Sequence, residues 1–170
     1  MKNKKIAIVI AGIVALLGIT GMYIWRQHND EVEQPPVTEQ IVKFNLEEEL
    51  YGGSKLVEIT AEEYNQLIQE QKSFVLIAHT EVCPAETPLT STAEALVHDD
   101  GYTFYGLKGD EFKNSMASET IKYLPSAAVI NRGEIVDYLD AESDEDIPYY
   151  QGADSLREWL QKYIKLERNK

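Results

Sequence analysis

From residue 56 onwards, short apolar runs alternate with stretches whose apolar positions recur every three or four residues. The short runs predict strands at 56–59, 73–78 and 102–107, followed by a β-hairpin over 124–139 with a tight turn at Arg132-Gly133. The helical spacing predicts a helix after Thr60, one from about 84 to 98, one over 113–123 and a closing helix after Ser155. The order β-α-β-α-β-α-β-β-α indicates an α/β fold with a central mixed sheet flanked by helices.

Capping boxes mark two of these helices. Thr60 and Glu63 have the spacing in which the N-cap hydroxyl and the carboxylate three residues later satisfy each other's backbone N–H groups. Ser155 and Glu158 repeat that spacing before the closing helix. The apolar face predicted for the closing helix consists of Leu156, Trp159, Leu160, Tyr163 and Ile164.

The N-terminal region has a different character. Residues 6–25 carry no charge, which is long enough to span a bilayer as one transmembrane helix. The lysines before this stretch predict a cytoplasmic N-terminus, and Tyr23 and Trp25 suit the opposite interface. We interpret 1–28 as a cytoplasmic stub and uncleaved membrane anchor. A cleaved signal peptide is the alternative, although its apolar segment is usually shorter.

Charge and proline content separate a linker from the folded part. Residues 29–55 are polar and acidic and include Pro35-Pro36, so we interpret them as an acidic linker leading to a domain at 56–170. Residues 27–170 hold 12 basic against 29 acidic side chains, a net charge of −17. A domain this acidic is not expected to bind nucleic acid.

Cys83 and Pro125 are the landmarks of the candidate site. Cys83 follows a buried apolar strand and opens a helix, and Pro125 comes 42 residues later, directly before the hairpin. This arrangement, over Leu56 to Leu166, resembles the thioredoxin-like superfamily. The resemblance implies a thioredoxin-like fold, with a cis-proline at Pro125 beside the active site.

The active-site motif departs from the family pattern. Glu86 stands where the family keeps its resolving cysteine, and Ile77 stands where it buries an acid that assists proton transfer. His79 and Val82 occupy positions that are usually aromatic in the family. Without a second thiol, dithiol cycling on this chain is not expected.

Three side chains near Cys83 in the sequence are expected to modulate its reactivity, namely His79, Glu81 and Glu86. A helix N-terminus stabilises a thiolate, whereas the carboxylates of Glu81 and Glu86 oppose it. His79 can pair with the thiolate if the loop curls back. The segment from Thr80 to Glu86 also resembles the Thr-x-x-Cys-Pro-x-Glu motif of peroxiredoxins, but neither their proline four residues earlier nor their arginine is found, which makes a peroxidase the weaker alternative.

Two functions stay open, and both place the site beside Pro125. The first is an extracytoplasmic accessory protein that binds an exported peptide or protein without redox cycling. The second is a monothiol thiol–disulfide oxidoreductase acting through Cys83, so whether the protein is an enzyme is left open. An anchored single-domain thioredoxin-like protein of this size resembles the bacteriocin transport accessory proteins of Gram-positive bacteria. This resemblance implies exported peptide clients and an export or membrane complex as partners. The predicted client-binding residues are Val82, Pro84, Leu124, Pro125 and Ser126.

The sequence indicates no cofactor. His28, His79, His98 and the single cysteine do not have metal-ligand spacing. The acidic stretch 140–148 lacks the glycine and the spaced ligands of a calcium loop, so we expect a solvated loop there.

Overall fold

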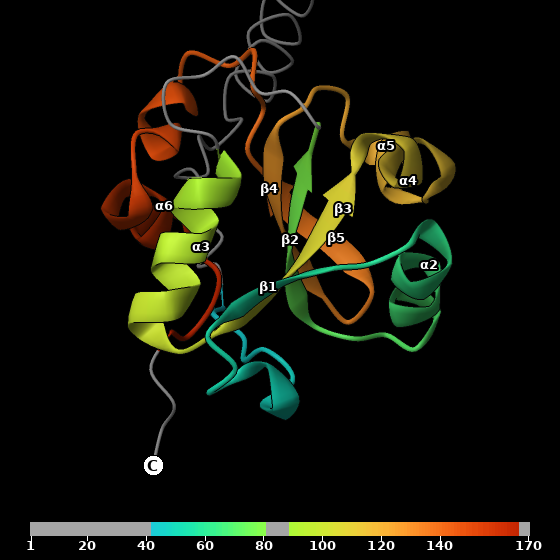
Figure 1. The fold of residues 1–170 in the computed structure, drawn as a ribbon, viewed down its shortest axis with the longest axis horizontal. Helices are drawn as coiled ribbons and strands as arrows, with labels where there is room; N and C mark the ends of the chain where they lie inside the picture. The colour runs from blue at the N-terminus through green and yellow to red at the C-terminus, as the bar shows by residue number, and fades with distance from the viewer. Residues whose placement is uncertain (1–41, 81–88, 167–170) are drawn as a thin grey trace, which may run out of the picture. The chain divides into compact units, whose positions relative to one another are not determined.

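The computed structural model describes residues 42–80 and 89–166, and these form one five-stranded mixed sheet with helices on both faces (Figure 1). The strand order is β1-β3-β2-β4-β5. The strands are β1 (Lys55–Glu58), β2 (Phe74–His79), β3 (Thr103–Lys108), β4 (Ser126–Asn131) and β5 (Glu134–Tyr138).

Strand direction reverses twice across this sheet, at β4 and again at β5. β1, β3 and β2 run parallel, while β4 is antiparallel to β2 and β5 is antiparallel to β4. At the β2–β4 junction Ser126 lies opposite Ala78, and Ile130 lies opposite Phe74. This order and these directions are those of the thioredoxin-like fold, as the sequence predicts.

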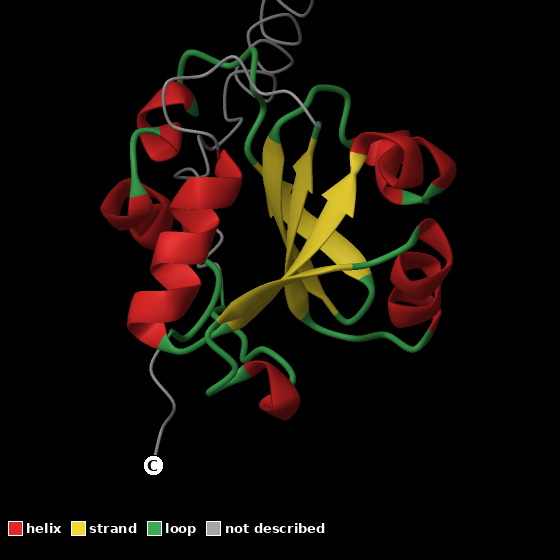
Figure 2. Ribbon diagram, in the orientation of Figure 1, coloured by secondary structure: helices red, strands yellow, loops and turns green. Residues whose placement is uncertain are grey.

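Helices cover the two faces of the sheet as separate layers (Figure 2). α3 (Leu89–Asp100) and α6 (Ala153–Leu160) lie on one face, and α2 (Ala61–Gln69), α4 (Gly109–Asn114) and α5 (Ala117–Thr120) lie on the other. All six residues of β2 are buried, which explains its continuous apolar sequence. The strands predicted at 56–59, 73–78 and 102–107 are confirmed to within one residue at each end, and the predicted hairpin over 124–139 forms from 126 to 138.

The first capping box forms as predicted. The Thr60 hydroxyl accepts a hydrogen bond from the Glu63 N–H at 3.2 Å, and the Glu63 carboxylate accepts one from the Thr60 N–H at 2.8 Å. A carboxylate from α4 adds to this helix start, because Glu111 accepts the Ala61 N–H at 2.7 Å. The N-terminus of α2 is therefore fixed by a local cap and a tertiary contact.

The helix predicted over 113–123 is wrong in its bounds. α4 begins at Gly109 and ends at Asn114, and Ser115 has an extended backbone conformation before the short α5 begins. The Ser115 hydroxyl donates to the Phe112 carbonyl at 2.8 Å, and the Met116 N–H donates to the Asn65 side chain of α2 at 2.9 Å. These side chains take backbone groups that a continuous helix would have used.

The second capping box is also wrong. α6 begins at Ala153, and Gly152 is its N-cap without a side-chain hydrogen bond. The helix ends at Leu160, so Tyr163 and Ile164 lie beyond it. Both still pack against the domain, since Tyr163 is partly buried against the core and Ile164 is fully buried and forms a parallel bridge with Phe44.

The end of the predicted linker, residues 42–55, packs onto the domain. Leu46 and Leu50 are buried in the core, and Leu50 is the last residue of the short 3-10 helix η1 (Glu48–Leu50), which precedes β1. The Glu47 N–H donates to the Ser73 carbonyl at 3.0 Å, which fastens this segment to the start of β2. The described domain therefore begins before the boundary expected at residue 56.

The hairpin turn follows the sequence expectation. Arg132 and Gly133 have φ angles of 53° and 79°, the positive values of a two-residue type I′ turn. A Cβ on Gly133 would lie 2.3 Å from the Ile68 carbonyl oxygen, so the close approach of α2 also requires glycine there.

The predicted transmembrane segment, 6–25, lies outside the described residues. Among the helices that are described, none combines the length and apolar character needed to cross a membrane.

Candidate functional site

The candidate site lies where the carboxyl ends of the parallel strands meet the start of β4. In open α/β sheets, ligands bind at this edge where strand order changes. Leu124, Pro125, Ser126 and His79 are described there. Five predicted site residues lie outside the described residues, namely Glu81, Val82, Cys83, Pro84 and Glu86.

The start of β4 combines a half-exposed backbone with a buried anchor. The Leu124–Pro125 peptide bond is cis, as the resemblance implies. Leu124 and Pro125 are half-buried, while Ser126 is fully buried opposite Ala78 of β2. These three predicted client-binding residues therefore pass from the surface into the centre of the sheet, next to the strand that leads towards Cys83.

Tyr150 was missed by the sequence interpretation, yet it contacts this segment directly. Its hydroxyl lies 2.9 Å from the Pro125 carbonyl oxygen and 3.0 Å from the Leu139 carbonyl oxygen. Burial, reinforced by the negative charges of Asp146 and Asp140, raises the pKa of Tyr150 well above its ordinary value. No local pattern marks it, because it sits in an acidic connection far along the chain from Pro125.

Tyr123, two residues before Pro125, interacts with the acidic connection. Its side chain is exposed, and the Glu142 carboxylate raises the Tyr123 pKa by its charge and by a hydrogen bond. Of the acidic residues in 140–146, Glu142, Asp144 and Glu145 are exposed and Asp140 and Asp146 are half-buried, and the Glu142 contact with Tyr123 joins their loop to the residues before β4.

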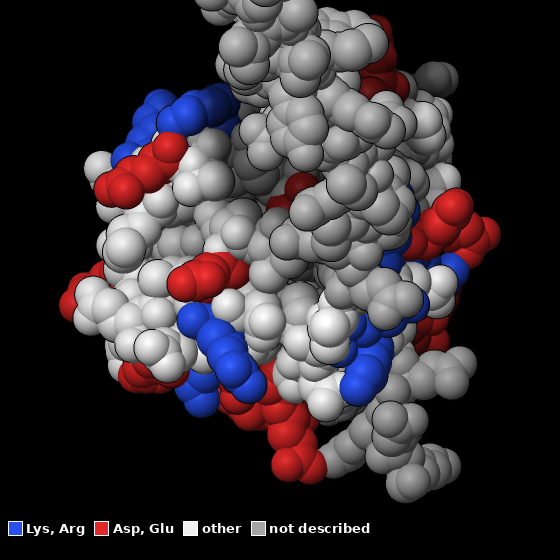
Figure 3. All heavy atoms as spheres, turned by 180° about the vertical axis from the view of Figure 1, so that it is seen from behind, with Lys and Arg blue, Asp and Glu red and all other residues white. Residues whose placement is uncertain are grey.

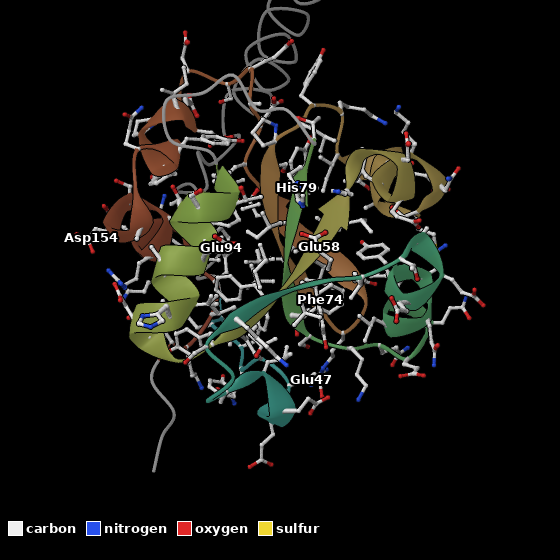
Figure 4. All side chains as sticks on the ribbon, in the orientation of Figure 1. Glu47, Glu58, Phe74, His79, Glu94 and Asp154 are labelled. Carbon is white, nitrogen blue, oxygen red and sulfur yellow. The ribbon has the colours of Figure 1, made fainter. Side chains whose placement is uncertain are left out.

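His79 is buried and both of its ring nitrogens have oxygen neighbours. Nε2 lies 2.9 Å from Glu58 Oε1, and Nδ1 lies 3.3 Å from the Thr80 carbonyl oxygen. Figure 4 shows Glu58 and His79 side by side at the sheet, although they come from β1 and β2. The expected pairing of His79 with Cys83 stays a prediction.

A glycine between them makes this contact possible. β3 separates β1 from β2, and its residue opposite Glu58 is Gly106. A Cβ at Gly106 would lie 2.5 Å from Glu58 Oε1 and 2.8 Å from its Cδ. The Glu58 side chain therefore reaches His79 across β3, through the space that a larger residue would fill.

Charges around the domain are mixed. On the face in Figure 3, acidic and basic side chains are interspersed among the described residues. At the site itself, Lys108 ends β3 opposite His79.

Among the residues that the structure describes, no group of three histidine, cysteine or acidic side chains is placed to hold a metal ion.

Solved structures similar to this chain have thioredoxin folds. The oxidised thioredoxin from Plasmodium falciparum is 18% identical, with a TM-score of 0.48, over 65% of this chain and 100% of that one. Thioredoxin f from spinach chloroplast is 20% identical, with a TM-score of 0.46, over 65% and 87%. A putative oxidoreductase with a thioredoxin fold is 16% identical, with a TM-score of 0.45, over 61% and 91%.

No protein-family model and no curated protein sequence matches the chain. The similarities above concern the fold alone, and the strand order and directions carry the fold assignment independently.

Proposed function

We propose that this chain is a thioredoxin-fold accessory protein that binds an extended segment of an exported client at Leu124–Ser126. The observation that carries the proposal is the placement of that segment. Leu124 and Pro125 are half-buried just before β4, and Ser126 begins β4, fully buried beside the carboxyl end of β2. An extended peptide can add main-chain hydrogen bonds at such a strand start, and alternate side chains then provide selectivity.

Location supports the same proposal. The uncharged segment 6–25 would anchor the chain in the cytoplasmic membrane, with the domain on the extracytoplasmic side. An anchored domain meets clients as they emerge from export. The resemblance to bacteriocin transport accessory proteins supports peptide clients and an export complex as partners.

Redox cycling is not needed for this function. The chain holds one cysteine, and dithiol exchange on one protein needs an attacking and a resolving thiol. Peptide addition at β4 uses main-chain groups and leaves Cys83 without an obligatory role.

A second function is favoured by the Glu58–His79 pair. This polar contact ends β2, the strand that leads towards Cys83. In a monothiol reaction, the Cys83 thiolate attacks a client disulfide, a new S–S bond forms, and one client sulfur leaves as a thiolate. An external low-molecular-weight thiol then attacks the mixed disulfide and releases Cys83.

Amide chemical-shift mapping tests the first function. The full-length chain in detergent micelles is titrated with a ten-residue peptide of alternating valine and threonine. We expect shifts concentrated at the amides of residues 78–80, 124 and 126, and Leu124→Asp should abolish them. Val136→Asp is the matched control, because Val136 is an exposed apolar residue of β5. Shifts spread evenly over the domain, or equal loss with both variants, would contradict the proposal.

A further inference from the structure

The connection between β5 and α6 leaves the sheet after Leu139, and Tyr150 brings it back into contact with Leu139. The ladder extends one residue past β5, because the Leu139 N–H donates to the Ala127 carbonyl at 2.8 Å. The chain then departs through the acidic loop and the 3-10 helix η2 (Ile147–Tyr150). Tyr150 brings it back, with its hydroxyl 3.0 Å from the Leu139 carbonyl oxygen and 2.9 Å from that of Pro125.

The excursion is closed by its own hydrogen bonds. The Asp140 N–H donates to Asp146 Oδ2 at 2.9 Å, and the Ser143 N–H donates to the Asp140 carbonyl at 3.1 Å. The Tyr149 N–H donates to the Asp146 carbonyl at 2.9 Å, which joins the loop to η2. A loop tied at both ends holds the position of the aromatic residue that follows it.

The chemistry of the Tyr150 contact requires a neutral phenol. Carbonyl oxygens only accept hydrogen bonds, so the single hydroxyl proton is given to one carbonyl or shared between the two. A phenolate would be repelled by both oxygens. A tyrosine hydroxyl is a neutral donor at pH 7 even at its ordinary pKa, and burial with the charges of Asp146 and Asp140 raises the Tyr150 pKa further.

We propose that Tyr150 is a positioning residue for the peptide-binding segment, its hydroxyl fixing the Pro125 carbonyl and thereby the main chain of Leu124–Ser126. This inference rests on the proposed client-binding function. The strands β4 and β5 separate beyond Leu139, so a ladder hydrogen bond no longer holds Pro125 on that side. Tyr150 takes the place of that bond, and the Leu124 side is left facing the client.

The test removes the hydroxyl oxygen of Tyr150 and compares the effect with removal of the hydroxyl oxygen of the neighbouring Tyr149. Tyr150→Phe deletes the hydroxyl that contacts Pro125, while Tyr149→Phe deletes the hydroxyl of a half-buried tyrosine whose partner is Lys162 in a solvent-exposed hydrogen bond. Binding of the fluorescein-labelled valine–threonine peptide is measured by anisotropy with the full-length chain in detergent. The same peptide with proline at alternate positions cannot donate the ladder hydrogen bonds and serves as the ligand control.

We expect Tyr150→Phe to weaken peptide binding about five-fold, the effect of one hydrogen bond, and Tyr149→Phe to leave it unchanged. In the free protein, Tyr150→Phe should move the amide resonances of residues 124 and 126. Incorporating p-aminophenylalanine at position 150 restores a donor and should restore binding.

Each other outcome has a definite meaning. If the unmodified chain binds the peptide and Tyr150→Phe binds it equally well, the inference fails while the proposed function stands. If the unmodified chain does not bind, both fail. A melting midpoint lowered by more than about 10 °C in Tyr150→Phe would also overturn the inference, because such a loss would show that the hydroxyl stabilises the whole domain rather than positioning one segment.

Discussion

Gly106→Ala should destabilise the domain through Glu58 rather than through Gly106 itself. The added Cβ would lie 2.5 Å from Glu58 Oε1, 2.8 Å from Cδ and 3.0 Å from Oε2, all atoms of one carboxylate. Because the Glu58 side chain is 52% exposed, it can move away into solvent. His79, whose side chain is only 10% exposed, would then lose the partner of Nε2.

Two opposing effects set the magnitude. A buried polar group left without its hydrogen bond destabilises a protein by about 1–3 kcal/mol. Replacing glycine by alanine where the backbone allows it stabilises by about 0.4–1 kcal/mol, because the unfolded chain loses freedom. We therefore expect Gly106→Ala to lower the free energy of unfolding by about 0.5–2 kcal/mol.

A double-mutant cycle with Glu58→Ala isolates the cause. Once the carboxylate is gone, Gly106→Ala displaces nothing of Glu58 and should be neutral or stabilising by up to about 1 kcal/mol. Urea unfolding of the four proteins, followed by circular dichroism, measures the coupling. Gly109→Ala is the control, since its added Cβ would come no closer than 3.8 Å to the His79 carbonyl oxygen. Equal destabilisation by Gly106→Ala in both backgrounds would refute the reasoning.

Three further predictions concern helix ends and helix contacts. Thr60→Ala should lower the free energy of unfolding by about 1 kcal/mol in urea titrations, because it removes the N-cap of α2; no loss would show that the cap is redundant. Hydrogen bonds from Thr60 hold the pKa of Glu63 below its usual value. The stabilising contribution of Glu63 is therefore present above pH 4.5 and is lost as pH falls through the lower folded-state pKa. Glu63→Gln should flatten that part of the curve of unfolding free energy against pH, and an unchanged curve would contradict this. Arg157→Lys should lower the melting midpoint by a few degrees. Nε and Nη2 of Arg157 contact the two Asp100 carboxylate oxygens at 2.7 and 3.2 Å, and lysine cannot reproduce this bidentate contact between α6 and α3. An unchanged midpoint in a thermal melt would refute this prediction.

The strands were predictable because their patterns are local. The continuous apolar run of β2 and the Arg132-Gly133 turn identify the central strand and the hairpin from a few residues each. The place of Pro125 beside the end of β2 was predictable from its order along the chain, given the resemblance. Side-chain competition within 109–120 was not predictable, because Ser115 and Asn65 interrupt the helix through contacts that depend on the folded structure.

The contacts that build the site depend on strand order. Glu58 and His79 are 21 residues apart and meet only because β3 lies between their strands and carries a glycine there. Tyr150 and Pro125 are 25 residues apart and meet only because the acidic loop folds back. Polar pairs of this kind have no periodic pattern, so the sequence identified Pro125 and His79 as candidates but neither of their partners.

The central claim is that Leu124–Ser126 binds an extended peptide without a thiol. The most direct measurement compares the peptide affinities of full-length Cys83→Ser and full-length Leu124→Asp with that of the unmodified chain. We predict that Cys83→Ser binds as tightly as the unmodified chain and that Leu124→Asp does not bind. Loss of binding in Cys83→Ser together with retention in Leu124→Asp would contradict the claim and favour the monothiol function.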